Sequence, residues 1–114
     1  MRVAELRFPK PTREDAERRR ALAPAAEDAF RAFSKAVFAA GALDTRTKQL
    51  IAVAVAHVTQ CPWCIEGHVK AAQRDGATPE QIMEAIWVAA EMRAGAAYAH
   101  SIKALELMGD AGSE

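Results

Sequence analysis

The chain has no net charge, no long apolar run and no alternating strand pattern, and each absence excludes a class of protein. Fifteen Lys and Arg residues balance fifteen Asp and Glu residues, so no overall field recruits nucleic acid or an anionic membrane. The apolar run Leu50–Val58 is far too short to span a bilayer. Because no apolar stretch follows a charged N-terminus, we expect no secretory signal. These absences predict a cytoplasmic protein that binds neither nucleic acid nor membrane.

The missing strand pattern and the abundance of alanine together predict an all-α fold. Alanine is the best helix former, and its small side chain lets helices approach closely. For 114 residues we expect one domain, a compact bundle of five or six helices. The predicted organisation is an N-terminal arm and short helix over residues 1–22, a helical domain over residues 23–108, and a disordered tail over residues 109–114.

Start and stop signals place the main helices. They are predicted from about 23 to 40, from 44 or 45 to about 60, from 62 to about 75, and from 78 to about 108. The second of these is apolar around almost its whole circumference, so we expect it to be buried. Gly95 is a potential bend or break in the last helix. The spacing there predicts an inner stripe of Ile82, Ile86, Ala89, Ala90, Arg93 and Ala97.

The only two cysteines lie three residues apart in Cys61-Pro62-Trp63-Cys64. Pro62 fits the first turn of a helix, which puts both thiols near a positive helix end that favours thiolates. His68 follows Cys64 by four residues and shares its helix face, where an imidazole can accept the thiol proton. We therefore predict that Cys64 attacks and that Cys61 resolves, so that a sulfenic acid on Cys64 is trapped as a disulfide.

Two other interpretations of the cysteine pair stay open at this point. Free cysteines are often plain buried apolar residues. Two thiolates with His68 and His57 also match the ligand types of a tetrahedral zinc site, but a second pair at finger spacing is absent. The redox interpretation is favoured, because close cysteines in a reducing compartment are typically catalytic. We predict neither a bound metal nor an organic cofactor.

The segment Lys48–His68 resembles the alkylhydroperoxidase D-like branch of the carboxymuconolactone decarboxylase superfamily. The similarity covers about residues 30–108 and extends through Val69–Ala72, Gly76–Thr78, Glu80–Ile82 and the small-residue stretch Val88–Ala97. It implies an all-helical fold, assembled as trimers or hexamers. It also implies peroxide reduction through the cysteine pair, with the second cysteine attacking.

The resemblance also implies roles for individual residues. Cys64 would be the peroxidatic thiol, Cys61 its partner and His68 the proton-relay imidazole. The family relay usually includes a glutamate twelve residues before the first cysteine, where this chain has Gln49. An amide can orient a water or His68, but it cannot take a proton. The founding peroxidase has a histidine just before the second cysteine, where this chain has Trp63.

Three further residues are candidate accessory groups. Glu91 lies in a mostly apolar stretch and is a candidate replacement for the missing acid, with Arg93 as its candidate partner. His57 precedes Cys61 by four residues, and a satisfied core or interface histidine is the favoured interpretation of it. Trp63 is more often a packing residue, although it can shield the disulfide or shape the mouth of a pocket.

The sequence thus predicts a thiol–disulfide enzyme that reduces hydroperoxides or disulfides, with electrons from a thiol reductant that the sequence does not identify. One alternative is a lactone decarboxylase, which needs acid–base groups but no paired thiols. The other is a non-enzymatic oligomeric redox-sensing module. Apolar residues make up 51% of this small domain. We therefore also predict a homo-oligomer, because apolar surface that one chain cannot cover tends to be buried between subunits.

Overall fold

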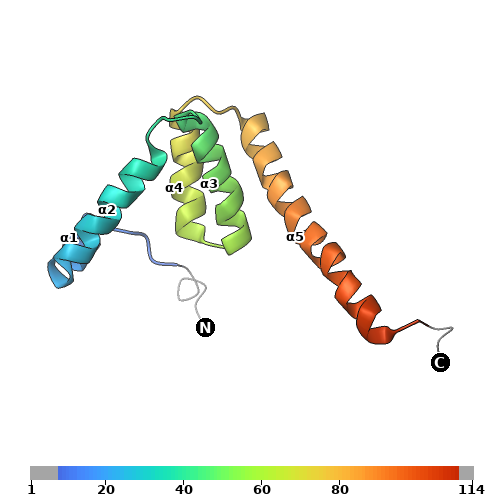
Figure 1. The fold of residues 1–114 in the computed structure, drawn as a ribbon. Coiled ribbons are helices and arrows are strands. Elements are labelled where there is room, and N and C mark those ends of the chain that lie inside the picture. Colours follow the sequence, from blue (N-terminus) through green and yellow to red (C-terminus); the bar gives the residue numbers. More distant parts are fainter. Residues whose placement is uncertain (1–7, 111–114) are drawn as a thin grey trace, which may run out of the picture. The chain divides into compact units, whose positions relative to one another are not determined.

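The computed structural model describes residues 8–110, and every regular element within them is a helix. These helices are α1 (Arg13–Leu22), α2 (Pro24–Phe38), α3 (Thr45–Thr59), α4 (Pro62–Arg74) and α5 (Pro79–Met108), as Figure 1 shows. For the described part of the chain, the all-α prediction is confirmed with five helices. The arm up to residue 7 and the tail from residue 111 lie outside the described residues.

The chain divides into two compact units, Met1–Thr45 and Arg46–Glu114. In the first unit, Thr12 and Asp15 form a capping box that begins α1, each side chain accepting the other's backbone N–H at 3.1 Å. Arg20 on α1 then donates to both carboxylate oxygens of Asp28 on α2, at 2.8 and 3.0 Å. This two-pronged hydrogen bond ties the two helices together and lowers the pKa of Asp28.

The second unit has a small core made largely of alanine and branched side chains. Its buried residues Val53, Ala72, Ala77 and Ile82 are flanked by the half-buried Leu50, Val69 and Ile86. α3 and α4 lie side by side in Figure 1, which agrees with their shared contribution to this core. Small alanine side chains let the α3 and α4 backbones approach, and this approach is what brings their polar residues within hydrogen-bond reach.

α5 begins at a capping box, as predicted, and then continues without interruption. Thr78 Oγ1 accepts the Gln81 N–H at 3.1 Å, and Gln81 Oε1 accepts the Thr78 N–H at 3.0 Å. The predicted bend or break at Gly95 is wrong, because α5 runs as one helix of 30 residues. A glycine in a helix costs only about 1 kcal/mol relative to alanine, and the alanines around Gly95 favour the helix.

Two predictions of burial are corrected by the structure. α3 was expected to be buried all round, yet Ile51 is 48% and Val55 52% exposed, and its buried residues lie on one face. On α5, the inner stripe holds only in its first half, because Ala90, Arg93 and Ala97 are exposed. Periodicity identifies the apolar side of a helix, but it does not say whether the same chain supplies a cover for it.

No helix within residues 8–110 combines the length and the apolar character needed to cross a bilayer.

Asp28→Asn is expected to loosen α1 from α2. The hydrogen bond from Arg20 lowers the pKa of Asp28, so its stabilisation is fully present above the ordinary carboxylate pKa of about 4 and is lost as pH falls through the lower folded value. Amide hydrogen-exchange protection factors in α1 should therefore decrease in the wild type below about pH 4. In Asp28→Asn they should already be low at pH 6. Equal protection of the two proteins at pH 6 would contradict this role.

Candidate active site

The cysteine pair begins in a two-residue turn between α3 and α4. Gln60 has a left-handed φ of 57°, which ends α3 and reverses the chain. The Cys61 N–H then donates to the Ala56 carbonyl at 3.1 Å and closes the last turn of α3. The sulfur of Cys61 accepts the Cys64 N–H at 3.2 Å, which makes Cys61 the N-cap of α4, as predicted. One residue therefore ends one helix and begins the next.

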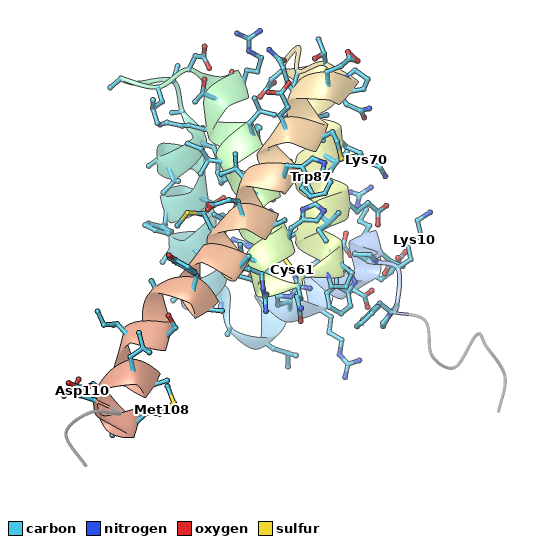
Figure 2. The ribbon with its side chains drawn as sticks, turned by 90° about the vertical axis from the view of Figure 1, so that its right-hand side faces the viewer. Lys10, Cys61, Lys70, Trp87, Met108 and Asp110 are labelled. Atoms are coloured by element: carbon cyan, nitrogen blue, oxygen red, sulfur yellow. A yellow bond between two sulfur atoms is a disulfide. The ribbon has the colours of Figure 1, made fainter. Side chains whose placement is uncertain are left out.

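Cys61 and Cys64 are joined by a disulfide, with their Cα atoms 5.2 Å apart. Both cysteines are half-buried, and Trp63 between them is 43% exposed, so the small disulfide ring lies at the surface of this unit. Cys61 is labelled in Figure 2, at the end of the α3–α4 pair. The amide that donates to the Cys61 sulfur belongs to the N-terminus of α4, where a thiolate is also stabilised once the disulfide opens.

His68 is held across the two helices by Gln49. Its Nδ1 donates to Oε1 of Gln49 at 2.7 Å, and Gln49 is only 7% exposed. Because a carbonyl oxygen only accepts hydrogen bonds, this contact puts a ring proton on Nδ1, and in the neutral imidazole the lone pair is then on Nε2. His68 follows Cys64 by one helical turn of α4, so the ring lies on the helix face that carries this cysteine.

The other candidate residues have different surroundings. The Nδ1 of His57 donates to the Val53 carbonyl at 2.8 Å within α3, the contact of a satisfied structural histidine. Glu91 is exposed, and its Oε1 lies 3.3 Å from the point where a Cβ on Gly95 would stand. Arg93 donates instead to the Val58 carbonyl, at 2.7 Å. Within the described residues the structure therefore joins Gln49 to His68, which follows Cys64 by one helical turn of α4, and none of the contacts described above joins Glu91 to these residues.

The zinc interpretation requires three or four ligands that lie close together. In the part of the chain that the structure describes, no three His, Cys, Asp or Glu side chains gather so that they could hold a metal ion. The two sulfur atoms that such a site would need are bonded to each other.

Two features of the site were missed by the sequence reasoning. The left-handed backbone at Gln60 has no sequence signal, since glycine or asparagine usually occupies such a position. The contact of Arg93 with the end of α3 joins residues 35 positions apart. The sequence predicts Arg93 as a partner of Glu91, because periodicity relates only residues within one helix, whereas the structure pairs Arg93 with Val58.

Comparison with known proteins identifies the family of this chain. A model of the carboxymuconolactone decarboxylase family matches residues 24–107. Uncharacterized protein 4 in the cox locus of Paracoccus denitrificans is 70% identical over 106 residues, which cover 93% of this chain and 95% of that protein.

Two solved structures extend the likeness to the fold. The crystal structure of a protein from Methanobacterium thermoautotrophicum is 33% identical with a TM-score of 0.71, covering 75% of this chain and 96% of the other. A carboxymuconolactone decarboxylase family protein from Thermotoga maritima is 26% identical with a TM-score of 0.55, covering 75% of this chain and 97% of the other. An involvement in the antioxidative response has been suggested for the Thermotoga maritima protein.

The residues matched by the family model include the whole candidate site, from Gln49 through the cysteine pair to His68. The five-helix fold agrees with the solved relatives, so the recognition made from the sequence is confirmed. The chain belongs to the carboxymuconolactone decarboxylase family.

Proposed function

We propose that this protein is a thiol–disulfide oxidoreductase that reduces hydroperoxides, or other disulfides, through Cys61 and Cys64. The observation that carries the proposal is the disulfide at the N-terminus of α4, one helical turn from a histidine whose tautomer is set by Gln49. The antioxidative role suggested for the Thermotoga maritima relative is a further support. A lactone decarboxylase needs acid–base groups but no paired thiols, so the disulfide favours the redox proposal.

The oxidising half of the cycle starts from the dithiol. His68 Nε2 takes the proton of Cys64, and the thiolate attacks the terminal oxygen of the hydroperoxide. The O–O bond breaks, and the alkoxide takes the proton back from His68 and leaves as an alcohol. Cys61 then attacks the sulfenic sulfur of Cys64, which forms the disulfide and releases one water.

The reducing half of the cycle needs an external dithiol. A thiolate of this reductant attacks the sulfur of Cys64, and Cys61 leaves as a thiolate that the Cys64 N–H can stabilise, as it does the disulfide sulfur at 3.2 Å. The second thiol of the reductant then releases Cys64, so that the protein regains two thiols and the reductant becomes a disulfide. Because such a cycle requires a reducing compartment, a cytoplasmic location is part of the proposal.

We also propose that the working form is a homo-oligomer, a trimer or hexamer as the family resemblance implies. Tyr98, Ile102 and Leu105 on the second half of α5 are 83%, 73% and 60% exposed. In both views the last turns of α5, up to Met108, extend past α3 and α4 (Figures 1 and 2). An isolated helix as short as this second half of α5 is only marginally stable in water. Packing of its apolar stripe against a second copy would stabilise it.

Replacing each cysteine separately should give two different defects. Cys64→Ser is expected to abolish hydroperoxide consumption, because serine has no reactive thiolate. Without an added reductant, Cys61→Ser should consume about one equivalent of hydroperoxide per chain and then stop with a sulfenic acid on Cys64, because no partner thiol traps it. Peroxide loss, with a defined dithiol for Cys64→Ser and without it for Cys61→Ser, and mass spectrometry after trapping with dimedone would measure the two defects.

Lys70→Ala is the matched control for this experiment, since Lys70 lies exposed on the same helix and pairs only with Glu66 among the contacts resolved for it. Its turnover should equal that of the wild type. Wild-type peroxide consumption by Cys64→Ser would refute the proposed thiol mechanism. A wild type that consumes no peroxide would favour the redox sensor or the decarboxylase.

Gln49→Glu should speed the reaction of Cys64 with hydroperoxide by about tenfold or more. A carboxylate of almost the same shape would stabilise the imidazolium that forms when His68 takes the thiol proton, whereas the neutral amide does so more weakly. Gln49→Met, which keeps the volume but loses the acceptor, should slow the reaction. The second-order rate constant, measured under single-turnover conditions, distinguishes them. Equal rates for all three proteins would show that the contact between residue 49 and His68 has no part in the chemistry.

The proposed assembly predicts a native mass that is a multiple of 12.3 kDa. Light scattering after size-exclusion chromatography should detect it, and Ile102→Lys should shift the protein towards the monomer, because the lysine places a charge within the apolar stripe. Lys103→Gln is the control one position along, with a side chain that is 70% exposed, and should leave the mass unchanged. A monomeric wild type at micromolar concentration would contradict the proposal.

A further inference from the structure

Two helix ends of opposite partial charge meet at Gln60 and Cys61, the turn between α3 and α4. The C-terminus of α3 has carbonyl groups without partners in the helix and a partial negative charge, whereas the N-terminus of α4 has a partial positive charge. Cys61 belongs to both ends, since its N–H bonds to the Ala56 carbonyl and its sulfur accepts the Cys64 N–H. The α4 end favours a thiolate at this position, and the α3 end opposes it.

Arg93 brings a positive charge to the unfavourable end. Its Nη1 donates to the carbonyl of Val58, in the last turn of α3, at 2.7 Å. Cys61 bonds to the same last turn of α3, because its N–H donates to the Ala56 carbonyl at 3.1 Å. The guanidinium therefore offsets the negative end of α3 near enough to act on the cysteine pair.

We propose that Arg93 is a positioning residue that tunes the redox equilibrium of Cys61 and Cys64 by holding and neutralising the end of α3. Reduction of the disulfide by two electrons and one proton yields one thiol and one thiolate, and the electrons come from an external dithiol that becomes a disulfide. A nearby cation stabilises the thiolate but not the neutral disulfide. Arg93 therefore shifts the equilibrium towards the reduced pair. This inference rests on the proposed redox role of the two cysteines.

The electrostatic effect of Arg93 should outweigh a loosening of the disulfide ring. The ring closes within the first turn of α4, where Pro62 and the hydrogen bond from Cys64 N–H to Cys61 hold it. Val58 belongs to α3, outside the ring. Loss of Arg93 therefore removes a charge and frees the end of α3, while the ring geometry is kept by α4.

The experiment equilibrates the protein with a buffer of reduced and oxidised dithiothreitol and measures the fraction of reduced cysteine pair. Arg93→Gln should lower the equilibrium constant for reduction about two- to fivefold, the size expected for one cation at an exposed helix end. This change corresponds to a reduction potential of the cysteine pair that is about 9–21 mV more negative. The difference should shrink in 1 M salt, where the screening length is about 3 Å. The Cys61 amide should also exchange faster, because the end of α3 is no longer held.

Two variants make the test specific. Arg93→Lys keeps the charge and should retain most of the wild-type equilibrium constant. Arg74→Gln removes an equal charge at the other end of α4 and should leave the constant unchanged. The inference is overturned if Arg93→Gln matches the wild type, or if it matches Arg93→Lys with no dependence on salt. Should Arg93→Gln fail to fold by circular dichroism, Arg93→Met, which also removes the charge but keeps most of the aliphatic stem, takes its place with the same expected result and the same overturning result.

The outcomes also separate this inference from the proposed function. A shift in the equilibrium constant in a protein that consumes no hydroperoxide would leave the role of Arg93 standing and remove the peroxidase activity. Peroxide turnover together with an equilibrium constant that does not depend on Arg93 would support the peroxidase activity and remove the role of Arg93.

Discussion

Cys61 is shared by two helices, and this constraint determines the arrangement of the whole site. Its backbone N–H completes α3 and its sulfur caps α4, so that only Gln60 lies between the helix end at Thr59 and the residue that begins the next helix. The two helices must then run back along each other. That return places His68, two turns into α4, against Gln49 near the start of α3, where the 2.7 Å hydrogen bond forms.

The hydrogen bond between Gln49 and His68 selects a tautomer without adding charge. A buried carboxylate at residue 49 would have to lose its hydration and would be costly unless His68 were protonated. The amide avoids this cost and still leaves the lone pair on Nε2, where it can accept a proton from Cys64. The result is an oriented imidazole with a neutral partner, where the family resemblance implies an acid. The same geometry therefore supports thiol chemistry with less help for the proton transfer.

The small size of the buried core is linked to the exposed apolar surface. Within residues 8–110, five of the seven buried apolar residues are alanines, whose burial stabilises the fold less than that of larger side chains. Larger apolar residues such as Trp87, Met92 and Ile102 on α5 remain 68%, 61% and 73% exposed, and Figure 2 shows Trp87 on this helix. Close approach of α3 and α4 needs small residues, and the large ones are then left for contacts that one chain does not make for itself.

The sequence alone was enough to predict the helices, the capping residues Cys61 and Thr78, and the position of Cys64 and His68 one turn apart on the same helix. These features depend on residues within four positions of each other, whose relation is set by helix geometry. It was not enough to predict which face of α3 is covered, that α5 continues through Gly95, or where Arg93 binds. Only the tertiary structure decided that Gln49 meets His68 and that Arg93 meets Val58, because each contact joins different helices, and local spacing carries no information about how helices are placed against each other.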